Sequence, residues 1–174
     1  LISAGRPDEA VTLLNEWLEK QPDDQQARMA LVGIDLAAKR YDAAEAQLTK
    51  LLEKQPGNVM ALNNLAWVYH QKNDERARAI AQRAYLLGPT PYVADTFGWI
   101  MTTQGEAALA LPLLRQASRE LPNEASVQYH YAVALNEAGK REEAASILRP
   151  LVTGNTVFDE KPAATKLYET IGRR

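Results

Sequence analysis

The chain has 174 residues, 46% of them hydrophobic, so it can bury the core of one domain or one short repeat array. Its formal net charge of −2 gives no electrostatic basis for binding nucleic acid or an anionic membrane surface. Cysteine is absent, which excludes disulfides, thiolate metal ligands and a cysteine nucleophile, and the sequence has no run of about 20 apolar residues that could form a membrane span.

Three independent columns of residues recur with a period close to 34. Prolines follow one another at spacings of 34, 33 and 33 residues, at Pro22, Pro56, Pro89 and Pro122. A small residue recurs with nearly the same spacing at Ala10, Ala44, Ala77, Ala110 and Ala144. An apolar position accompanies it at Leu14, Leu48, Ala81, Leu114 and Leu148. Agreement among separate columns predicts an array of similar structural units rather than one irregular domain.

The first segment, residues 1–22, reads as the second helix of an incomplete repeat, over about residues 7–20. Gly5 is expected to end a preceding helix in the left-handed conformation. Trp17 occupies a column that holds Leu51, Ala84, Ala117 and Leu151 elsewhere, so it is predicted to be a core residue. The chain starts at Leu1 with neither an initiator Met nor a signal peptide. We therefore expect a piece of a longer protein, whose earlier repeats cover an apolar flank on this helix.

Four complete repeats follow, at residues 23–56, 57–90, 91–123 and 124–156, each with two helices. Their helical pairs are predicted over about residues 24–55, 58–88, 91–121 and 124–153, with Gly105 and Gly139 in the turns between paired helices. Single-residue deletions fall in the turns "QKNDE" and "GPTP", where a loop absorbs a length change without rotating a buried face. Pro112 and Pro150 lie inside second helices, where we expect a local bend.

The last segment, residues 157–174, is predicted to form a capping helix from about Asp159 to Ile171. Its apolar residues share one side of that helix, and polar residues fill the other: Ala163, Ala164, Leu167, Tyr168 and Ile171. Such a helix shields the last repeat and presents a polar outer face to water.

The period, the small-residue column and the closing prolines together resemble the tetratricopeptide repeat (TPR) family over nearly the whole length. The resemblance implies an all-α fold, a right-handed α-solenoid of helix-turn-helix repeats with a C-terminal capping helix, as a single array over residues 1–174. In this family the first helix of each repeat lines the concave face, and the second helix lies outside.

Carrying the inward positions of the family over to this sequence predicts a concave groove that binds a ligand or partner. Its predicted lining consists of ten residues: Met60, Asn63, Trp67, His70, Gln71, Tyr92, Asp95, Trp99, Thr102 and Tyr129. Two interpretations of Trp67 and Trp99 stay open. The indoles either fill space between adjacent first helices or anchor a ligand, as aromatic side chains with an N–H group do at interfaces.

The sequence predicts no enzyme, metal site or cofactor. His70 and His130 belong to different repeats and helix faces, and neither has an acidic residue or a second His four residues away in ligand geometry. No serine has a nucleophile-elbow context, and no Gly-rich loop follows a strand. The carboxylate clamp of some TPR proteins lacks its basic residues here. Asn63 and Asn64 resemble its amides, but Asn64 is expected to be buried between helices.

Finer sequence features over about residues 58–171, such as "ALNNLAWVYHQKND" and "FDEKPAATKLYETI", resemble the lipoproteins encoded with PEP-CTERM/exosortase and exopolysaccharide systems. This resemblance implies a periplasmic or outer-membrane-associated protein of a Gram-negative bacterium. Three functions are open: a scaffold that binds a protein or peptide segment in the groove, a glycan-binding module whose indoles stack on sugar rings, and an enzyme or enzyme subunit. The first is our hypothesis, and the second is its main alternative.

Overall fold

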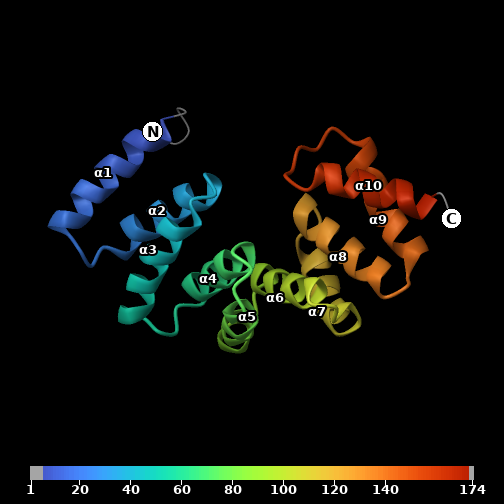
Figure 1. Cartoon of the computed structure of the whole chain (residues 1–174), viewed down its shortest axis with the longest axis horizontal. Coiled ribbons are helices and arrows are strands. Elements are labelled where there is room, and N and C mark those ends of the chain that lie inside the picture. The colour runs from blue at the N-terminus through green and yellow to red at the C-terminus, as the bar shows by residue number, and fades with distance from the viewer. Residues whose placement is uncertain (1–5, 173–174) are drawn as a thin grey trace. The chain divides into compact units, whose positions relative to one another are not determined.

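The computed structural model describes residues 6–172, and within this range it is built of ten α-helices (Figure 1). In chain order they are α1 (Pro7–Lys20), α2 (Gln25–Ala37), α3 (Tyr41–Lys54), α4 (Val59–Gln71), α5 (Arg76–Leu87), α6 (Pro91–Thr103), α7 (Ala107–Glu120), α8 (Ala125–Glu137), α9 (Arg141–Thr153) and α10 (Lys161–Gly172). The predicted helix-turn-helix fold is confirmed, and α1 has the predicted bounds.

Side-chain caps begin several first helices. Asp24 accepts a hydrogen bond from the backbone N–H of Ala27 at 3.0 Å, and Asn58 accepts one in the same way from Ala61. Each cap satisfies an N–H group that has no partner inside the helix. The predicted left-handed turn residues are confirmed at Gly105 and Gly139, with φ of 83° and 81°. Gly5 lies outside the described residues.

The two other turns between paired helices use non-glycine residues for the same conformation. Lys39 has φ of 56° and Asn73 has φ of 55°. Asn adopts this region more readily than most residues, whereas Lys is disfavoured there. The conformation is therefore a property of the repeat, and glycine only makes it less costly.

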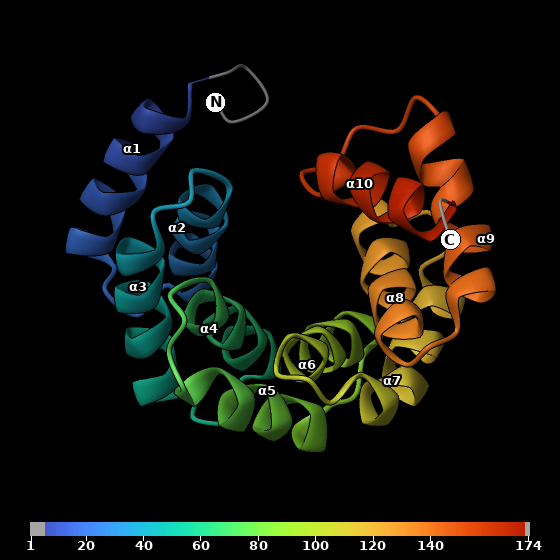
Figure 2. The same cartoon turned by 45° about the vertical axis from the view of Figure 1, so that its right-hand side comes forward.

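The chain divides into two compact units, unit 1 (Leu1–Gly88) and unit 2 (Pro89–Arg174). The division falls in the "GPTP" turn, one of the two places where the sequence is a residue short. Unit 1 contains α1 to α5. In it α2 and α4 form one layer, and α1, α3 and α5 form the other (Figure 2). The predicted small-residue column is buried between the layers, at Ala44 and Ala77.

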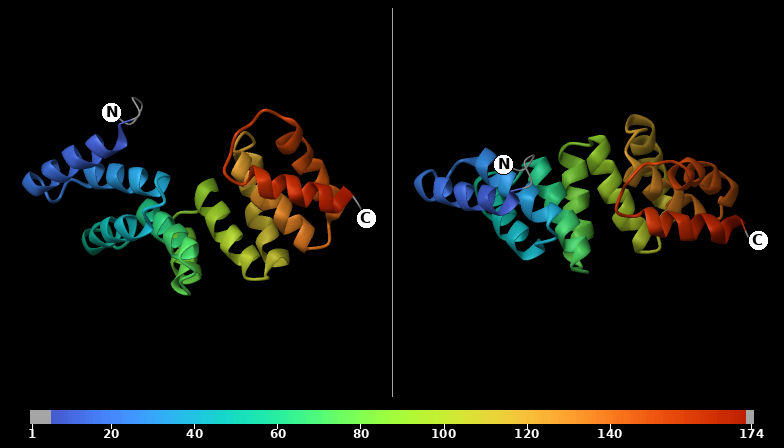
Figure 3. Two further views of the ribbon diagram at one scale, coloured as in Figure 1. Left: turned by 45° about the horizontal axis from the view of Figure 1, so that its top comes forward. Right: turned by 90° about the horizontal axis from the view of Figure 1, so that it is seen from above.

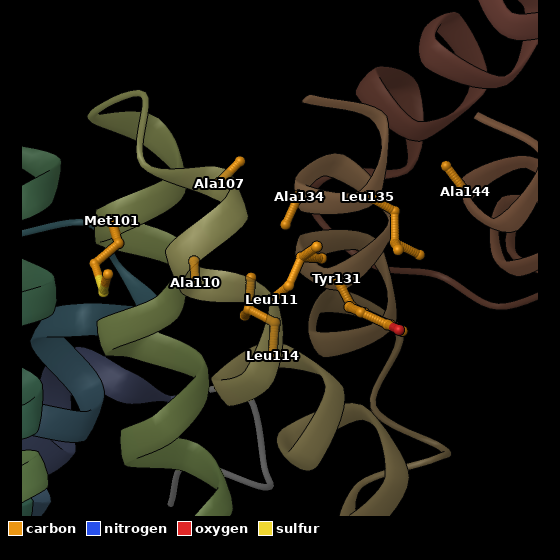
Figure 4. Close-up of a cluster of buried hydrophobic side chains, with 9 residues drawn as sticks. All are labelled: Met101, Ala107, Ala110, Leu111, Leu114, Tyr131, Ala134, Leu135 and Ala144. Carbon is orange, nitrogen blue, oxygen red and sulfur yellow. The ribbon is translucent and has the colours of Figure 1, made fainter. Parts of the chain in front are cut away.

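Unit 2 contains α6 to α10, with α6 paired to α7 and α8 paired to α9 (Figure 3). Its core gathers Ala110 and Leu114 of α7 with Tyr131 and Leu135 of α8 (Figure 4). A Cβ atom added at Gly98 of α6 would lie 2.7 Å from Cγ of Leu114. Glycine at this position therefore allows α6 and α7 to approach closely.

The capping helix α10 begins at Lys161, two residues after the predicted start. Ala164 is fully buried in the cluster that α8 and α9 form, and Leu167 and Tyr168 pack against that cluster. The cap is confirmed, with one correction: Ala163 is exposed rather than on the packed side. Pro112 and Pro150 lie inside α7 and α9, as predicted.

The prediction that Trp17 is a core residue is wrong. Its side chain is 49% exposed, and its indole N–H donates to a carboxylate oxygen of Asp24 at 2.8 Å. The N–H of Ala27 and then this indole lower the pKa of Asp24. In the later second helices the same column is buried beside the first helix of its own repeat, as at Ala117. Among the described helices α1 has no such paired helix, and it packs on α2.

Candidate partner-binding site

Five of the predicted groove residues lie on α4, and we call them the α4 stripe: Met60, Asn63, Trp67, His70 and Gln71. Spacings of three, four and three residues from Met60 to His70, and of four from Trp67 to Gln71, place them on one face of the helix. Met60 is 64% exposed and the other four are half-buried, whereas Leu62, Leu65 and Tyr69 are buried on the opposite side. The stripe is therefore a surface of unit 1 that a partner can reach.

Aromatic and polar side chains of the stripe contact one another and the neighbouring α3. The rings of Trp67 and His70 lie with centroids 5.8 Å apart at an angle of 46°. Gln71 accepts a hydrogen bond from the hydroxyl of Tyr41 at 3.3 Å. The Oδ1 atom of Asn63 is buried and has no hydrogen-bond partner within the described part of the chain. The stripe thus combines a thioether, an indole and an unsatisfied amide oxygen, and it contains no Asp, Glu, Lys or Arg.

A network of charged residues borders the C-terminal end of α4. The ammonium group of Lys72 donates to Asp42 and Glu45 of α3, each at 2.6 Å. Arg76 donates to Asp74 at 2.6 Å and lies over the ring of Tyr69, with its guanidinium carbon 4.0 Å from the ring centroid. These bonds hold the α4–α5 turn against α3. They leave the charges engaged with one another rather than with the stripe.

The neighbouring first helix of unit 1, α2, carries Met29 and Gly33 at the columns of Asn63 and Trp67. Met29 is half-buried and Gly33 is exposed. Outside the helix's own backbone and the two chain neighbours, no atom of the described residues lies within 4 Å of a Cβ built at Gly33. The α2 surface beside the α4 stripe is therefore uncharged and open at this point.

Unit 2 contains the other five predicted residues, and it buries three of them. Tyr92 is 54% exposed and Trp99 is half-buried on α6, but Asp95, Thr102 and Tyr129 are only 8%, 5% and 9% exposed. Burial removes these three side chains from the surface that a partner could reach, which corrects the predicted lining. It also raises the pKa of the Tyr129 phenol, because the charged form is disfavoured away from water.

The cause of the burial is a contact between α6 and α8. Nδ1 of His130 lies 3.0 Å from both carboxylate oxygens of Asp95, and His130 is 3% exposed. The imidazole stacks on the indole of Trp99, with centroids 4.2 Å apart and the planes 16° from parallel. Tyr129 contacts the same indole at 6.0 Å. Trp99 therefore packs between first helices, which is the first of the two interpretations given above.

Sequence reasoning missed the Asp95–His130 pair because the two residues are 35 apart and on different helices. The sequence did contain one indication of the pair. Asp95 and His130 are separated by one repeat length and one further residue, which places them on adjacent first helices. Asn64 was expected to be buried, but it is half-buried.

Within residues 6–172 no group of three or more His, Asp or Glu side chains is placed to hold a metal ion. In the same range, no helix has both the length and the apolar composition of a membrane span.

Solved structures share this fold at low sequence identity. A thermophilic TPR protein of Thermus thermophilus is 19% identical with a TM-score of 0.72, and the match covers 100% of this chain and 94% of the other. YrrB, a TPR protein with an unusual peptide-binding site, is 20% identical with a TM-score of 0.64 over 95% of this chain and 87% of its own. Identities this low show the fold alone.

Two longer proteins are related in sequence. A TPR repeat-containing protein of Pseudomonas aeruginosa is 30% identical over 161 residues, which cover 71% of this chain and 27% of that protein. Cellulose synthase 1 operon protein C of Komagataeibacter xylinus is 27% identical over 172 residues, 94% of this chain and 13% of that protein. The chain thus spans about a quarter and about an eighth of these relatives.

Family models agree with the repeat period. One tetratricopeptide repeat model matches residues 1–66 and 101–153, and a second matches residues 48–87. The first model alone accounts for more than half of the chain, and the helix pairs of both units follow the same period. The chain therefore belongs to the tetratricopeptide repeat family.

Proposed function

We propose that this chain is a non-catalytic interaction scaffold that binds a segment of a protein partner along the α4 stripe. The observation that carries the proposal is the exposure of Met60 beside the half-buried Trp67, on a helix face without charged residues. An exposed thioether and a partly accessible indole on one helix face are typical anchors of peptide-binding surfaces. The TPR fold, which many interaction scaffolds share, supports the same function.

The amide of Asn63 gives the stripe a polar group among its apolar anchors. Its Oδ1 atom lacks a donor among the described residues, and a buried acceptor without a donor costs free energy. A peptide N–H group supplies such a donor once the amide turns toward the partner. Truncation of Trp67 is expected to cost about 2 kcal/mol or more of binding free energy if the indole is a hot spot.

The partner segment is proposed to be apolar and uncharged at the positions that contact the stripe. A charged side chain facing Met60 and Trp67 would lose hydration without gaining an opposite charge. A basic or acidic segment is disfavoured for this reason, which separates this site from the carboxylate clamp of other TPR proteins.

The proposal extends to the cellular setting. The relation to a cellulose synthase operon protein and the resemblance to PEP-CTERM-system lipoproteins both support a scaffold in the envelope of a Gram-negative bacterium, in a system that exports or assembles exopolysaccharide or surface proteins. The proposed partner is a protein of that system rather than the polysaccharide itself.

The test is affinity capture from a Gram-negative envelope extract with three immobilised forms of the chain: the parent, Trp67→Ala and Trp17→Ala. Trp17 is the matched control, because it is an exposed indole on α1 away from the stripe. We expect a protein that the parent and Trp17→Ala retain and Trp67→Ala loses. Equal retention by all three forms, or retention of carbohydrate in place of protein, would overturn the proposal.

A further inference from the structure

Among the described residues, no contact requires glycine at position 33. It lies in the interior of α2, where glycine costs more backbone entropy on folding than alanine does. Its φ lies outside the left-handed region, so an L-residue would adopt the same backbone without strain. Apart from its chain neighbours and the backbone of its own helix, no atom of residues 6–172 lies within 4 Å of a Cβ built there.

Gly98, on the equivalent first helix of unit 2, is a glycine that the packing does require. A Cβ there would meet the side chain of Leu114 at 2.7 Å, so the packing of α7 on α6 excludes any larger residue. The glycine in α2 is thus a cost to the fold that no contact within the described residues explains.

The position of Gly33 connects it with the α4 stripe. It occupies the column of Trp67 one repeat earlier, 34 residues before it, and α2 and α4 form one layer of unit 1 (Figure 2). By column, the exposed Gly33 of α2 therefore corresponds to the position of the indole on α4. A glycine at such a place allows a ligand to approach the helix backbone closely.

We propose that Gly33 determines specificity at this site: the space over its Cα accepts a bulky apolar side chain of the partner, which packs between the α2 backbone and Trp67. The inference rests on the proposed function and adds the chemistry of the bound residue. The absence of Asp, Glu, Lys and Arg from both helix faces at these columns favours an aromatic or large aliphatic side chain over a charged one. Met29 and Met60, with flexible and polarisable side chains, are suited to adjust around it.

The experiment selects binders from a phage library of random dodecapeptides on the parent chain, and then measures the affinity of one enriched synthetic peptide for four variants. These are Gly33→Ala, Trp67→Ala, Gly57→Ala and Trp17→Ala. Gly57→Ala is the matched glycine control, since Gly57 lies in the α3–α4 turn and a Cβ there meets no described atom within 4 Å besides those of its chain neighbours.

We expect enriched peptides to share a large apolar residue, and Gly33→Ala to weaken the selected peptide at least tenfold while its Tm stays equal to or above that of the parent. A Tm that holds while affinity falls separates a role in binding from a role in folding. Trp67→Ala should lose the peptide as well, and both control variants should keep parent affinity.

The other outcomes separate the two claims. Loss of binding in Trp67→Ala with parent affinity in Gly33→Ala would contradict the role of Gly33 and leave the proposed function standing. Failure to enrich any peptide, or equal affinity in Trp67→Ala and the parent, would overturn the proposed function and this inference together.

Discussion

The first helices α4 and α6 carry equivalent columns of residues, and the two columns have different surroundings. On α4 the stripe from Met60 to Gln71 is reachable from solvent. On α6 the equivalent column pairs Asp95 with His130 and stacks Trp99 on the same imidazole. A repeat column fixes the direction of a side chain. Within unit 2, residues of the next first helix, α8, decide that the side chains of Asp95 and Trp99 pack.

The difference has a chemical basis at one pair of equivalent positions, Asn63 on α4 and Asp95 on α6. Asp95 stands where α4 has Asn63, and a carboxylate attracts the imidazole that closes over Trp99. The amide of Asn63 carries no charge that attracts an imidazole. Its Oδ1 atom has no hydrogen-bond donor among the described residues. The same scaffold therefore serves as core in unit 2 and as candidate binding surface in unit 1.

The largest effect is expected from His130→Ala. Removal of the imidazole leaves the buried carboxylate of Asp95 without its partner and exposes one face of Trp99, so the free energy of unfolding should fall by about 3–5 kcal/mol. Urea denaturation measures it. His70→Ala, at a half-buried position of the α4 stripe, is the comparison and should lower stability less than His130→Ala does. Equal effects at the two histidines would remove the contrast between the units.

Ala110→Leu tests the packing of α7 on α6. Ala110 is fully buried in the core of unit 2, so three added carbon atoms force the helices apart at a cost of about 1–3 kcal/mol. Thermal melting measures the change, with Ala108→Leu on the exposed side of the same helix as control. A Tm shift of less than a degree in Ala110→Leu would show that the assigned register of this repeat is wrong.

The two tryptophans should separate stability from binding. Trp99→Ala removes an indole that packs on Tyr129 and His130, and it should lower the free energy of unfolding by about 1.5–2.5 kcal/mol, roughly half of the loss for a fully buried tryptophan. Trp67→Ala should leave stability nearer to that of the parent and abolish partner capture. Capture lost in Trp99→Ala at unchanged Tm would contradict this division.

The smallest effect is expected in the pH dependence of unit 1. Hydrogen bonds from the side chain and backbone N–H of Arg76 lower the pKa of Asp74 to about 2 from its ordinary value of 3.8. This stabilisation is fully present above pH 3.8 and is lost as the pH falls through 2. Asp74→Asn should therefore flatten the dependence of Tm on pH between about 4 and 2. An identical acid-side slope in the variant and the parent would contradict the assignment.

The period of the sequence predicted the helices because the same apolar positions recur in every repeat. The bounds of α1, the left-handed turns at Gly105 and Gly139, and the burial of Ala44 and Ala110 all follow from those columns. These features depend on local propensity and on the contact between paired helices, which the spacing alone encodes.

The exceptions arise where a side chain depends on a specific neighbour. Trp17 is exposed because α1 lacks a paired first helix among the described residues, and Asp95 is buried because His130 lies opposite. Neither fact is contained in the column to which the residue belongs. Of the predicted lining, the α4 residues remain candidates, since Met60 is exposed and Asn63, Trp67, His70 and Gln71 are only half-buried.

The most direct test is a two-dimensional ¹H–¹⁵N NMR spectrum of the chain, in which each of the three tryptophans gives one indole N–H resonance. Single Trp→Phe variants assign the three signals, and a dodecapeptide selected on the parent chain is then added. If the α4 stripe is the binding surface, the Trp67 resonance shifts on titration while the Trp17 and Trp99 resonances stay in place. A shift of Trp17 or Trp99 with Trp67 unchanged would contradict it.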